Sequence, residues 1–170
     1  RVRETARGVH EALDALKMPS FVKTTGSKGL HLYVPIVRGP VQKQVWTFAK
    51  ALAQQLAARY PALITAEYRV AKRPRGRVLV DYNQNAWGRT LASIYSVRPR
   101  PEASVSTPVT WAEVERGIRI EDFTVNNVPA RLCEAYSGRY PLQVTGLFNP
   151  RLGGGIYMLV KDLNDIYKYY

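Results

Sequence analysis

SFVKTTGSKGLHLYVPI (residues 20–36) contains two apolar runs that are separated by a polar turn. FVKT (21–24) and LHLYVPI (30–36) are strand-like in composition, and TGSKG (25–29) carries the glycines typical of a tight turn. The segment therefore predicts two strands that are joined by a short loop.

Two amphipathic helices flank these strands in the sequence. Apolar residues recur every three or four positions over residues 2–17 and again from 41 to about 59, which predicts helices that bury one face. Further predicted elements are a strand at 78–82, a strand or short helix at 90–97, a Pro- and Ser-rich loop at 99–110 and a last core helix at 128–136. This mixture predicts an α/β (α+β) fold.

Composition limits the class of protein. The 170 residues are 46% apolar and 22% charged, which is typical of one globular domain. The single cysteine, Cys133, excludes a disulfide framework and a zinc site of several thiolates, and it favours a reducing, cytoplasmic compartment. No apolar run approaches the roughly 18–20 residues of a membrane span, so we expect no membrane partner.

The charge balance gives the first positive indication of function. Twenty-five Lys and Arg against thirteen Asp and Glu leave a net charge of +12. This excess favours a polyphosphate partner, namely DNA, RNA or a nucleoside triphosphate. A ribosome-like structural protein and a binder of anionic membranes remain alternatives. In the basic stretch VAKRPRGR (70–77), we expect Lys72, Arg73 and Arg75 to contact backbone phosphate.

The loop between the first two strands is a candidate phosphate site. Its glycines let backbone N–H groups approach an anion, Thr25 and Ser27 can donate hydrogen bonds, and Lys28 adds charge. The Walker A spacing is absent. A solvated turn, with His31 as a structural histidine, is the alternative.

Asp81 is a candidate metal ligand. It ends the apolar run Val78–Val80, where an unpaired carboxylate is costly and a hard cation such as Mg²⁺ or Mn²⁺ would suit it. Alternatively, it caps a turn or pairs with Arg89. We expect no second carboxylate in a comparable context, because Glu67 and Glu113 are interpreted as surface residues.

Downstream of Asp81 lie two arginines and two aromatic residues that are candidates for function. Arg98 and Arg100 alternate, so in an extended segment both point the same way and can hold a triphosphate, or else form surface salt bridges. Trp87 and Tyr95 are interpreted as core residues rather than base-stacking ones.

Three segments together resemble one family, the polymerase domain of bacterial DNA ligase D, within the archaeo-eukaryotic primase superfamily. They are SFVKTTGSKGLHLYVPI (20–36), RVLVDYNQNAWGRTLASIYSVRPRPEASVSTPVTWAEV (77–114) and EDFTVNNVPARL (121–132). The resemblance implies a primase-polymerase core with a mixed RRM-like sheet flanked by helices. It implies a reaction that adds nucleotides, preferably ribonucleotides, to DNA 3′ ends in non-homologous end joining, with Mn²⁺ or Mg²⁺ as the cofactor.

The resemblance also implies roles for individual residues. Asp81 falls on a catalytic carboxylate that holds metal, and His31 on the catalytic motif's histidine. The positions that match contacts to the incoming nucleotide are Thr25, Lys28, His31, Arg98 and Arg100, with Ser27 in the same turn. Implied partners are DNA with breaks or gaps, NTP or dNTP, ligase and nuclease domains of the parent protein, and a Ku-like end-binding protein, all at the nucleoid.

One departure separates the chain from the family pattern. The family's first motif, a strand with Asp-x-Asp, would lie before residue 1, so we interpret the domain (1–141) as truncated at its N-terminus. Residues 142–170 do not match and are treated as a tail of uncertain structure. The alternative functions are therefore a catalytically inactive module that binds nucleotide or DNA ends, and a stand-alone primase.

Overall fold

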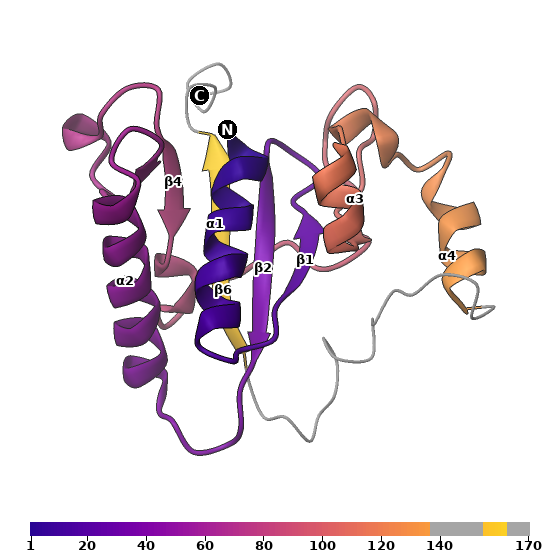
Figure 1. The fold of residues 1–170 in the computed structure, drawn as a ribbon. Helices are drawn as coiled ribbons and strands as arrows, with labels where there is room; N and C mark the ends of the chain where they lie inside the picture. Colours follow the sequence, from indigo (N-terminus) through magenta and orange to yellow (C-terminus); the bar gives the residue numbers. More distant parts are fainter. Residues whose placement is uncertain (137–154, 163–170) are drawn as a thin grey trace.

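The computed structural model describes residues 1–136 and 155–162. A six-stranded sheet in the order β3-β4-β6-β2-β1-β5 forms its centre (Figure 1). The strands are β1 (Phe21–Thr24), β2 (Gly29–Pro35), β3 (Ile64–Thr65), β4 (Val78–Asp81), β5 (Pro108–Val109) and β6 (Gly155–Asp162). Because β3 and β4 are parallel and the other pairs antiparallel, the sheet is mixed, and the predicted α/β class is confirmed.

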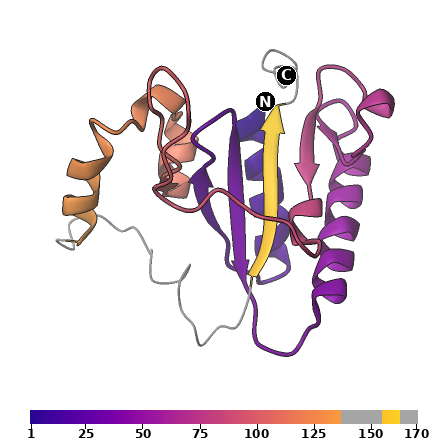
Figure 2. The ribbon, with the colours of Figure 1, turned by 180° about the vertical axis from the view of Figure 1, so that it is seen from behind.

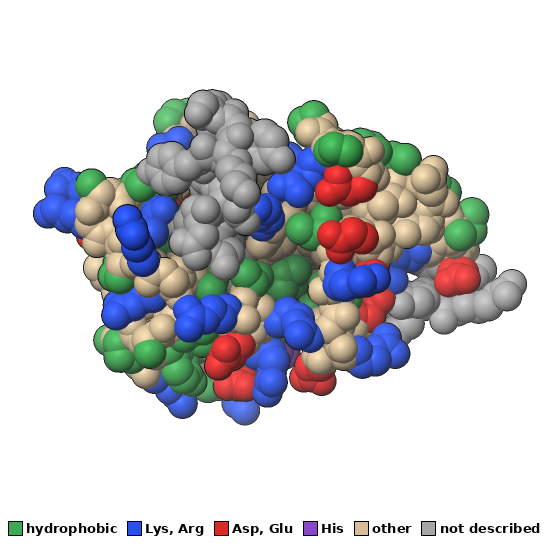
Figure 3. Space-filling model, turned by 90° about the horizontal axis from the view of Figure 1, so that it is seen from above, with side chains coloured by type: hydrophobic (Ala, Val, Ile, Leu, Met, Phe, Trp, Pro, Cys, Tyr) green, Lys and Arg blue, Asp and Glu red, His purple; other side chains and the backbone are tan. Residues whose placement is uncertain are grey.

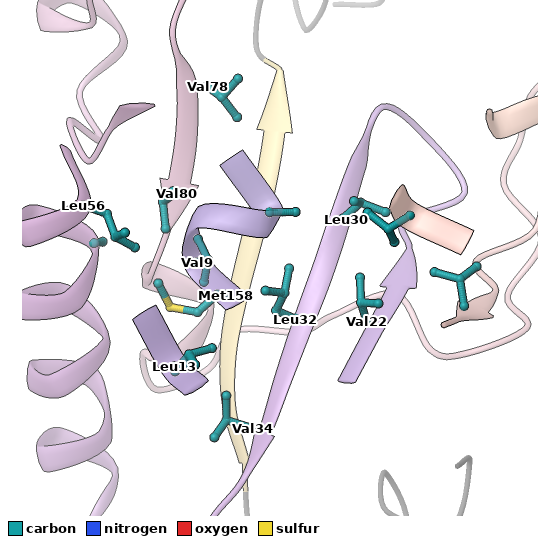
Figure 4. Packing of buried hydrophobic residues seen from close by; sticks show 14 of the residues in the cluster. Val9, Leu13, Val22, Leu30, Leu32, Val34, Leu56, Val78, Val80 and Met158 are labelled. Atoms are coloured by element: carbon teal, nitrogen blue, oxygen red, sulfur yellow. The ribbon is translucent and has the colours of Figure 1, made fainter. Parts of the chain in front are cut away.

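Helices α1 (Val2–Ala15) and α2 (Gln42–Arg59) pack on one face of the sheet (Figure 1). Both lie where the apolar periodicity predicts them. Their apolar sides meet those of the strands in one buried cluster (Figure 4), which includes Val9, Leu13, Leu32, Leu56, Val80 and Met158. This cluster excludes water from the helix-covered face and fixes the strands beneath it.

The central strand β6 comes from the far end of the chain. It lies between β4 and β2 and is antiparallel to both, with Met158 completely buried. The sequence analysis assigned no structure to 142–170, because the segment matches no family motif. Its strand at 155–162 is a finding of the structure, whereas 137–154 and 163–170 lie outside the described residues.

The opposite face of the sheet is crossed by the chain between β4 and β5 (Figure 2). This segment begins with the short helix η2 (Asn83–Asn85) and contains little regular structure. The predicted strand or helix at 90–97 is wrong: Ile94 and Tyr95 form a turn, Tyr95 has a φ of 59°, and an isolated bridge joins Val97 to Val105. Backbone hydrogen bonds between residues 95–98 and 104–106 hold the segment in place of a regular strand.

Beyond β5 lie α3 (Trp111–Arg116), η3 (Ile120–Asp122) and α4 (Val128–Tyr136). As predicted, Thr110 caps α3, its Oγ1 accepting a hydrogen bond from Glu113 N at 3.2 Å. The interpretation of Glu113 as a surface residue is wrong. Its side chain is buried, and Arg131 donates hydrogen bonds to both its carboxylate oxygens in an ion pair. No helix in the described part of the chain is long and apolar enough to span a membrane.

Candidate nucleotide-binding site

Three polar residues lie in one row across the sheet. Lys23 of β1 pairs with His31 of β2, His31 pairs with Leu159 of β6, and Leu159 also pairs with Asp81 of β4. With neighbouring strands about 4.8 Å apart, the Cα atoms of His31 and Asp81 are about 10 Å from each other. We call Lys23, His31 and Asp81 the cross-strand row.

Strand alternation places the cross-strand row away from the helices. The sequence neighbours Val22, Leu32 and Val80 belong to the apolar cluster under α1 and α2, and successive side chains of a strand point to opposite faces. All three members of the row are nevertheless buried, with relative exposures of 0%, 6% and 1% for Lys23, His31 and Asp81. The crossing segment in Figure 2 runs over this face of the sheet.

The turn that precedes β2 is built by its own side chains. The Thr25 hydroxyl accepts hydrogen bonds from the backbone N–H groups of Ser27 and Gly29, at 3.0 and 3.2 Å. Gly26 has a φ of +64°, and a Cβ atom there would lie 2.6 Å from Arg98 Cγ, so no other residue fits without displacement. Thr25 thus shapes the loop, and its contact with a nucleotide stays a prediction.

Both predicted arginines reach this turn. Residues 92–106, here called the arginine loop, fold back on themselves through hydrogen bonds such as Arg98 N to Ser104 O, at 2.8 Å. The Arg100 guanidinium donates to Ser27 Oγ at 3.0 Å, and the Arg98 stem packs against Gly26. The structure therefore joins Arg98 and Arg100 to the glycine turn from a distance of more than 70 residues in the sequence.

A pocket of about 360 Å³ opens beside the turn. It is bounded by the start of α1, the turn itself and residues 118–121. Four basic residues contribute to its lining, Arg1, Arg3, Lys28 and Arg119, against one acidic residue, Glu121. Lys28 and Ser27 thus face a cavity whose charge suits an anion.

Asp81 sits in a turn that orders its carboxylate. Its Oδ1 accepts a hydrogen bond from Asn83 N at 2.9 Å, and its Oδ2 accepts one from Gln84 Nε2 at 3.3 Å, so it caps the turn that leads into η2. Trp46 of α2 supports this turn by donating to Asn83 Oδ1 at 3.0 Å. Burial, with the carboxylates of Glu67 and Asp81, raises the pKa of the adjacent Tyr82.

The described residues do not by themselves make a metal centre. No group of three or more His, Cys, Asp or Glu side chains gathers anywhere among them. Asp81 is the only carboxylate of the cross-strand row, and both its oxygens already accept hydrogen bonds. A divalent ion at Asp81 would need further ligands from outside the part of the chain that the structure describes.

Comparison with known proteins places this geometry in a family. The family model described as "LigD, primase-polymerase domain" matches residues 1–138. The chain belongs to this family. The LigD protein of Mycobacterium tuberculosis, named as a multifunctional non-homologous end joining DNA repair protein, is 37% identical over 115 residues, which are 68% of this chain and 15% of that protein.

One further relative and one solved structure agree. LigD of Pseudomonas aeruginosa is 36% identical over 122 residues, which cover 72% of this chain and 14% of the relative. The solved polymerase domain of M. tuberculosis ligase D in complex with DNA superposes with a TM-score of 0.74 at 32% identity, covering 86% of this chain and 49% of that one. The chain thus spans about half of the solved domain and about a seventh of the curated relatives it matches.

Within this LigD primase-polymerase fold, the predicted DNA-binding residues lie apart from the cross-strand row. Lys72 and Arg75 are exposed in the loop between β3 and β4, which contains η1 (Val70–Lys72). Arg73 instead donates to the carbonyl oxygens of Glu67 and Tyr68, at 3.0 and 2.9 Å, and orders the loop. Figure 3 shows Lys and Arg side chains along much of the face seen from above, interspersed with acidic ones.

The aromatic residues of the crossing segment divide between two environments. Tyr95 packs against the core, as predicted. The core assignment of Trp87 is wrong, because its side chain is 90% exposed. Trp87 lies in a turn with Gly88, whose φ is +72°, and the exposed Arg89 follows. No strand or helix places its side chain in the core.

Sequence analysis missed one member of the site, Lys23. It appeared only as the polar position of a short strand, where lysine normally points to solvent. Its burial depends on the arginine loop, whose residues Ala92 and Ser106 accept its hydrogen bonds. The sequence did offer one indication of its position: Lys23 lies eight residues before His31, so a hairpin places the two residues opposite each other.

Proposed function

We propose that this chain forms the nucleotide-binding part of a polymerase that adds nucleotides, preferably ribonucleotides, to DNA 3′ ends during non-homologous end joining. The observation that carries the proposal is the placement of His31 and Asp81 on one sheet face, in register through β6. The glycine turn with Lys28 and the arginine loop lies at the start of the same strand β2. DNA with breaks or gaps is the proposed substrate, in the cytoplasm at the nucleoid.

The chemistry of these residues suits phosphoryl transfer. That reaction gains mainly from positioning and from neutralising charge on the triphosphate, which Lys28, Arg98 and Arg100 are placed to do. The proposal includes Mn²⁺ or Mg²⁺ as cofactor, with Asp81 as one ligand. The remaining ligands would come from outside the described residues. The proposed partners also include ligase and nuclease domains of a parent protein and a Ku-like end-binding protein.

The experiment is ribonucleotide addition to a gapped duplex with a 5′-phosphate, in the presence of Mn²⁺. It compares this chain, the same chain extended by its natural upstream sequence, and Asp81→Ala in each. Asp14→Ala is the matched control, because Asp14 is an exposed carboxylate of α1. We expect addition of ribonucleotides to the DNA primer, which Asp81→Ala abolishes and Asp14→Ala leaves unchanged. Nucleotide addition that survives Asp81→Ala contradicts the metal assignment.

A second candidate has an observation of its own. No group of three or more His, Cys, Asp or Glu side chains forms around Asp81 among the described residues, which favours a module that binds nucleotide or DNA ends without catalysis. Binding of ATP and of DNA ends by this chain, with no extension even after the upstream sequence is added, would select this candidate over the polymerase. Extension of a primer at an existing end, with no synthesis on unprimed template, would separate both from a stand-alone primase.

A further inference from the structure

Lys23 is buried in a way that lysines rarely are. Its side chain has no solvent exposure, although a lysine is almost never fully buried without a charged partner. No carboxylate in residues 1–134 forms an ion pair with it. Its ammonium instead donates to Ala92 O at 2.9 Å and to Ser106 Oγ, and lies 5.9 Å from the centre of the Tyr33 ring.

The two acceptors of Lys23 are the two ends of the arginine loop. Ala92 is the first residue of that loop and Ser106 the last, so one ammonium ties both limbs to β1. Between them the loop closes on itself, for example through Tyr95 N to Ser106 O at 2.7 Å. Arg98 and Arg100 lie inside this closed segment, which is also tethered to residues 123–125, from Val105 N to Phe123 O at 2.8 Å and from Val125 N to Ala103 O at 3.2 Å.

Neutral hydrogen bonds lock the same loop to the turn. Ser104 Oγ donates to Gly26 O at 2.6 Å, and Ser106 Oγ donates to Thr24 O at 2.9 Å. The Lys23 ammonium adds a charged donor to this seam, beside the charged hydrogen bond from Arg100 to Ser27, and it also binds the Ala92 limb of the loop. Removing that charge leaves Ser106 bound to Thr24 while releasing the Ala92 limb.

We propose that Lys23 is a positioning residue, which holds the arginine loop so that Arg98 and Arg100 face the triphosphate of an incoming nucleotide at the glycine turn. The inference rests on the proposed nucleotide binding and adds a residue to it. Lys23 is too deeply buried to touch the nucleotide itself, so it acts through the loop.

The electrostatics of the site provide a readout that a merely structural lysine would not give. Burial and the neighbouring Arg98 lower the pKa of Lys23 to about 7. The titratable or charged groups on the elements around Lys23 are His31 and Tyr33 on β2, and Tyr95 and Arg98 in the arginine loop. On β5, Lys23 pairs with Pro108, which carries no charge. A triphosphate bound by Arg98 offsets the repulsion between the two cations, so binding draws a proton onto Lys23.

The experiment measures ATP binding by calorimetry in EDTA, at pH 6.5, 7.5 and 8.5 and in buffers of different ionisation enthalpy. For the full chain we expect affinity to fall by up to about tenfold from pH 6.5 to 8.5, with proton uptake on binding at pH 7.5. Lys23→Met keeps the length and apolar stem of the side chain but cannot carry a proton. It should bind ATP about tenfold more weakly at pH 6.5, with this proton uptake removed.

Two more variants make the result specific. Lys43→Met removes an exposed lysine of α2 and should behave as the unmodified chain. Lys23→Gln keeps a hydrogen-bond donor without a titrating charge, so it should recover part of the affinity and none of the proton uptake. It also covers the case in which Lys23→Met fails to fold, as judged by circular dichroism.

The failures of the two ideas differ. If the Lys23 variants bind ATP with the affinity and proton uptake of the unmodified chain, the positioning role is overturned and nucleotide binding stands. If the unmodified chain binds no ATP at any of the three pH values, the proposed function fails, and the role of Lys23 fails with it.

Discussion

The two faces of the sheet contrast sharply although they share the same strands. Under α1 and α2, residues such as Leu32, Val80 and Met158 form a continuous apolar cluster. On the other face, the cross-strand row of Lys23, His31 and Asp81 is buried as deeply, but under a crossing segment that meets it with hydrogen bonds. One face therefore stabilises the fold, and the other holds ionisable groups in fixed positions.

The contrast shows how a small domain can devote one strand to both tasks. In β2, Leu32 enters the core and the adjacent His31 enters the site, since successive residues alternate between faces. A shift of one residue in the pairing would exchange the two sets of side chains. The apolar face therefore fixes the register on which the proposed site depends.

The largest effect is expected from a charge placed on the apolar face. Leu32→Asp puts a carboxylate at a position with no exposure, so we expect a loss of more than about 4 kcal/mol in stability and no folded protein at 37 °C. Circular dichroism and urea unfolding measure it. Val37→Asp, at a position that is 74% exposed just beyond β2, is the control and should fold normally. A folded Leu32→Asp protein would show that the two faces are not distinct.

Local patterns predicted the parts of the fold that depend on local sequence. The apolar spacing of α1 and α2 and the alternation in β2 were sufficient, because helix and strand periods are set by nearby residues. The position of β6 was not predictable in this way. Its pairing with β2 joins residues at least 120 positions apart, and no short-range period specifies such a partner.

The site shows the same division. Asp81 and the Thr25–His31 segment were visible as polar residues in strand contexts, and the family resemblance assigned their roles. Lys23 was missed and Glu113 misplaced for one reason: each is buried by a segment distant in sequence, the arginine loop for Lys23 and Arg131 for Glu113. Burial of a polar residue is decided by its partners, which the residue's own neighbourhood does not reveal.

A smaller effect is expected within the polar face. Arg98→Ala should weaken ATP binding about tenfold to a hundredfold, as expected for the loss of a charged hydrogen-bond donor to phosphate, and leave DNA affinity unchanged. Arg89→Ala is the matched control, because Arg89 is exposed in the same crossing segment. Calorimetry with ATP and a fluorescence titration with a DNA duplex separate the two affinities. Equal ATP affinity in Arg98→Ala and Arg89→Ala would remove Arg98 from the site.

The smallest effect, and the most informative about the cost of the polar face, concerns stability against pH. Lys23 has a pKa of about 7 in the folded protein, below the ordinary lysine value of 10.5, so between these two pH values the unfolded chain binds more protons. Raising the pH through this window therefore stabilises the unmodified chain, by about 1 kcal/mol from pH 7 to pH 8. Below pH 7 both states hold the proton, and the penalty for burying the charge is constant.

Lys23→Met isolates that contribution, since every other titrating group is common to both proteins. Urea unfolding from pH 6.5 to 9 should show the unmodified chain gaining stability relative to Lys23→Met as the pH rises; parallel curves would mean that the buried lysine carries no charge near neutrality. The buried apolar cluster contributes no comparable pH dependence to stability, because none of its buried residues titrates. Near neutral pH the polar face thus keeps a lysine that lowers stability, and a triphosphate that binds the arginine loop recovers part of that loss by favouring the charged ammonium.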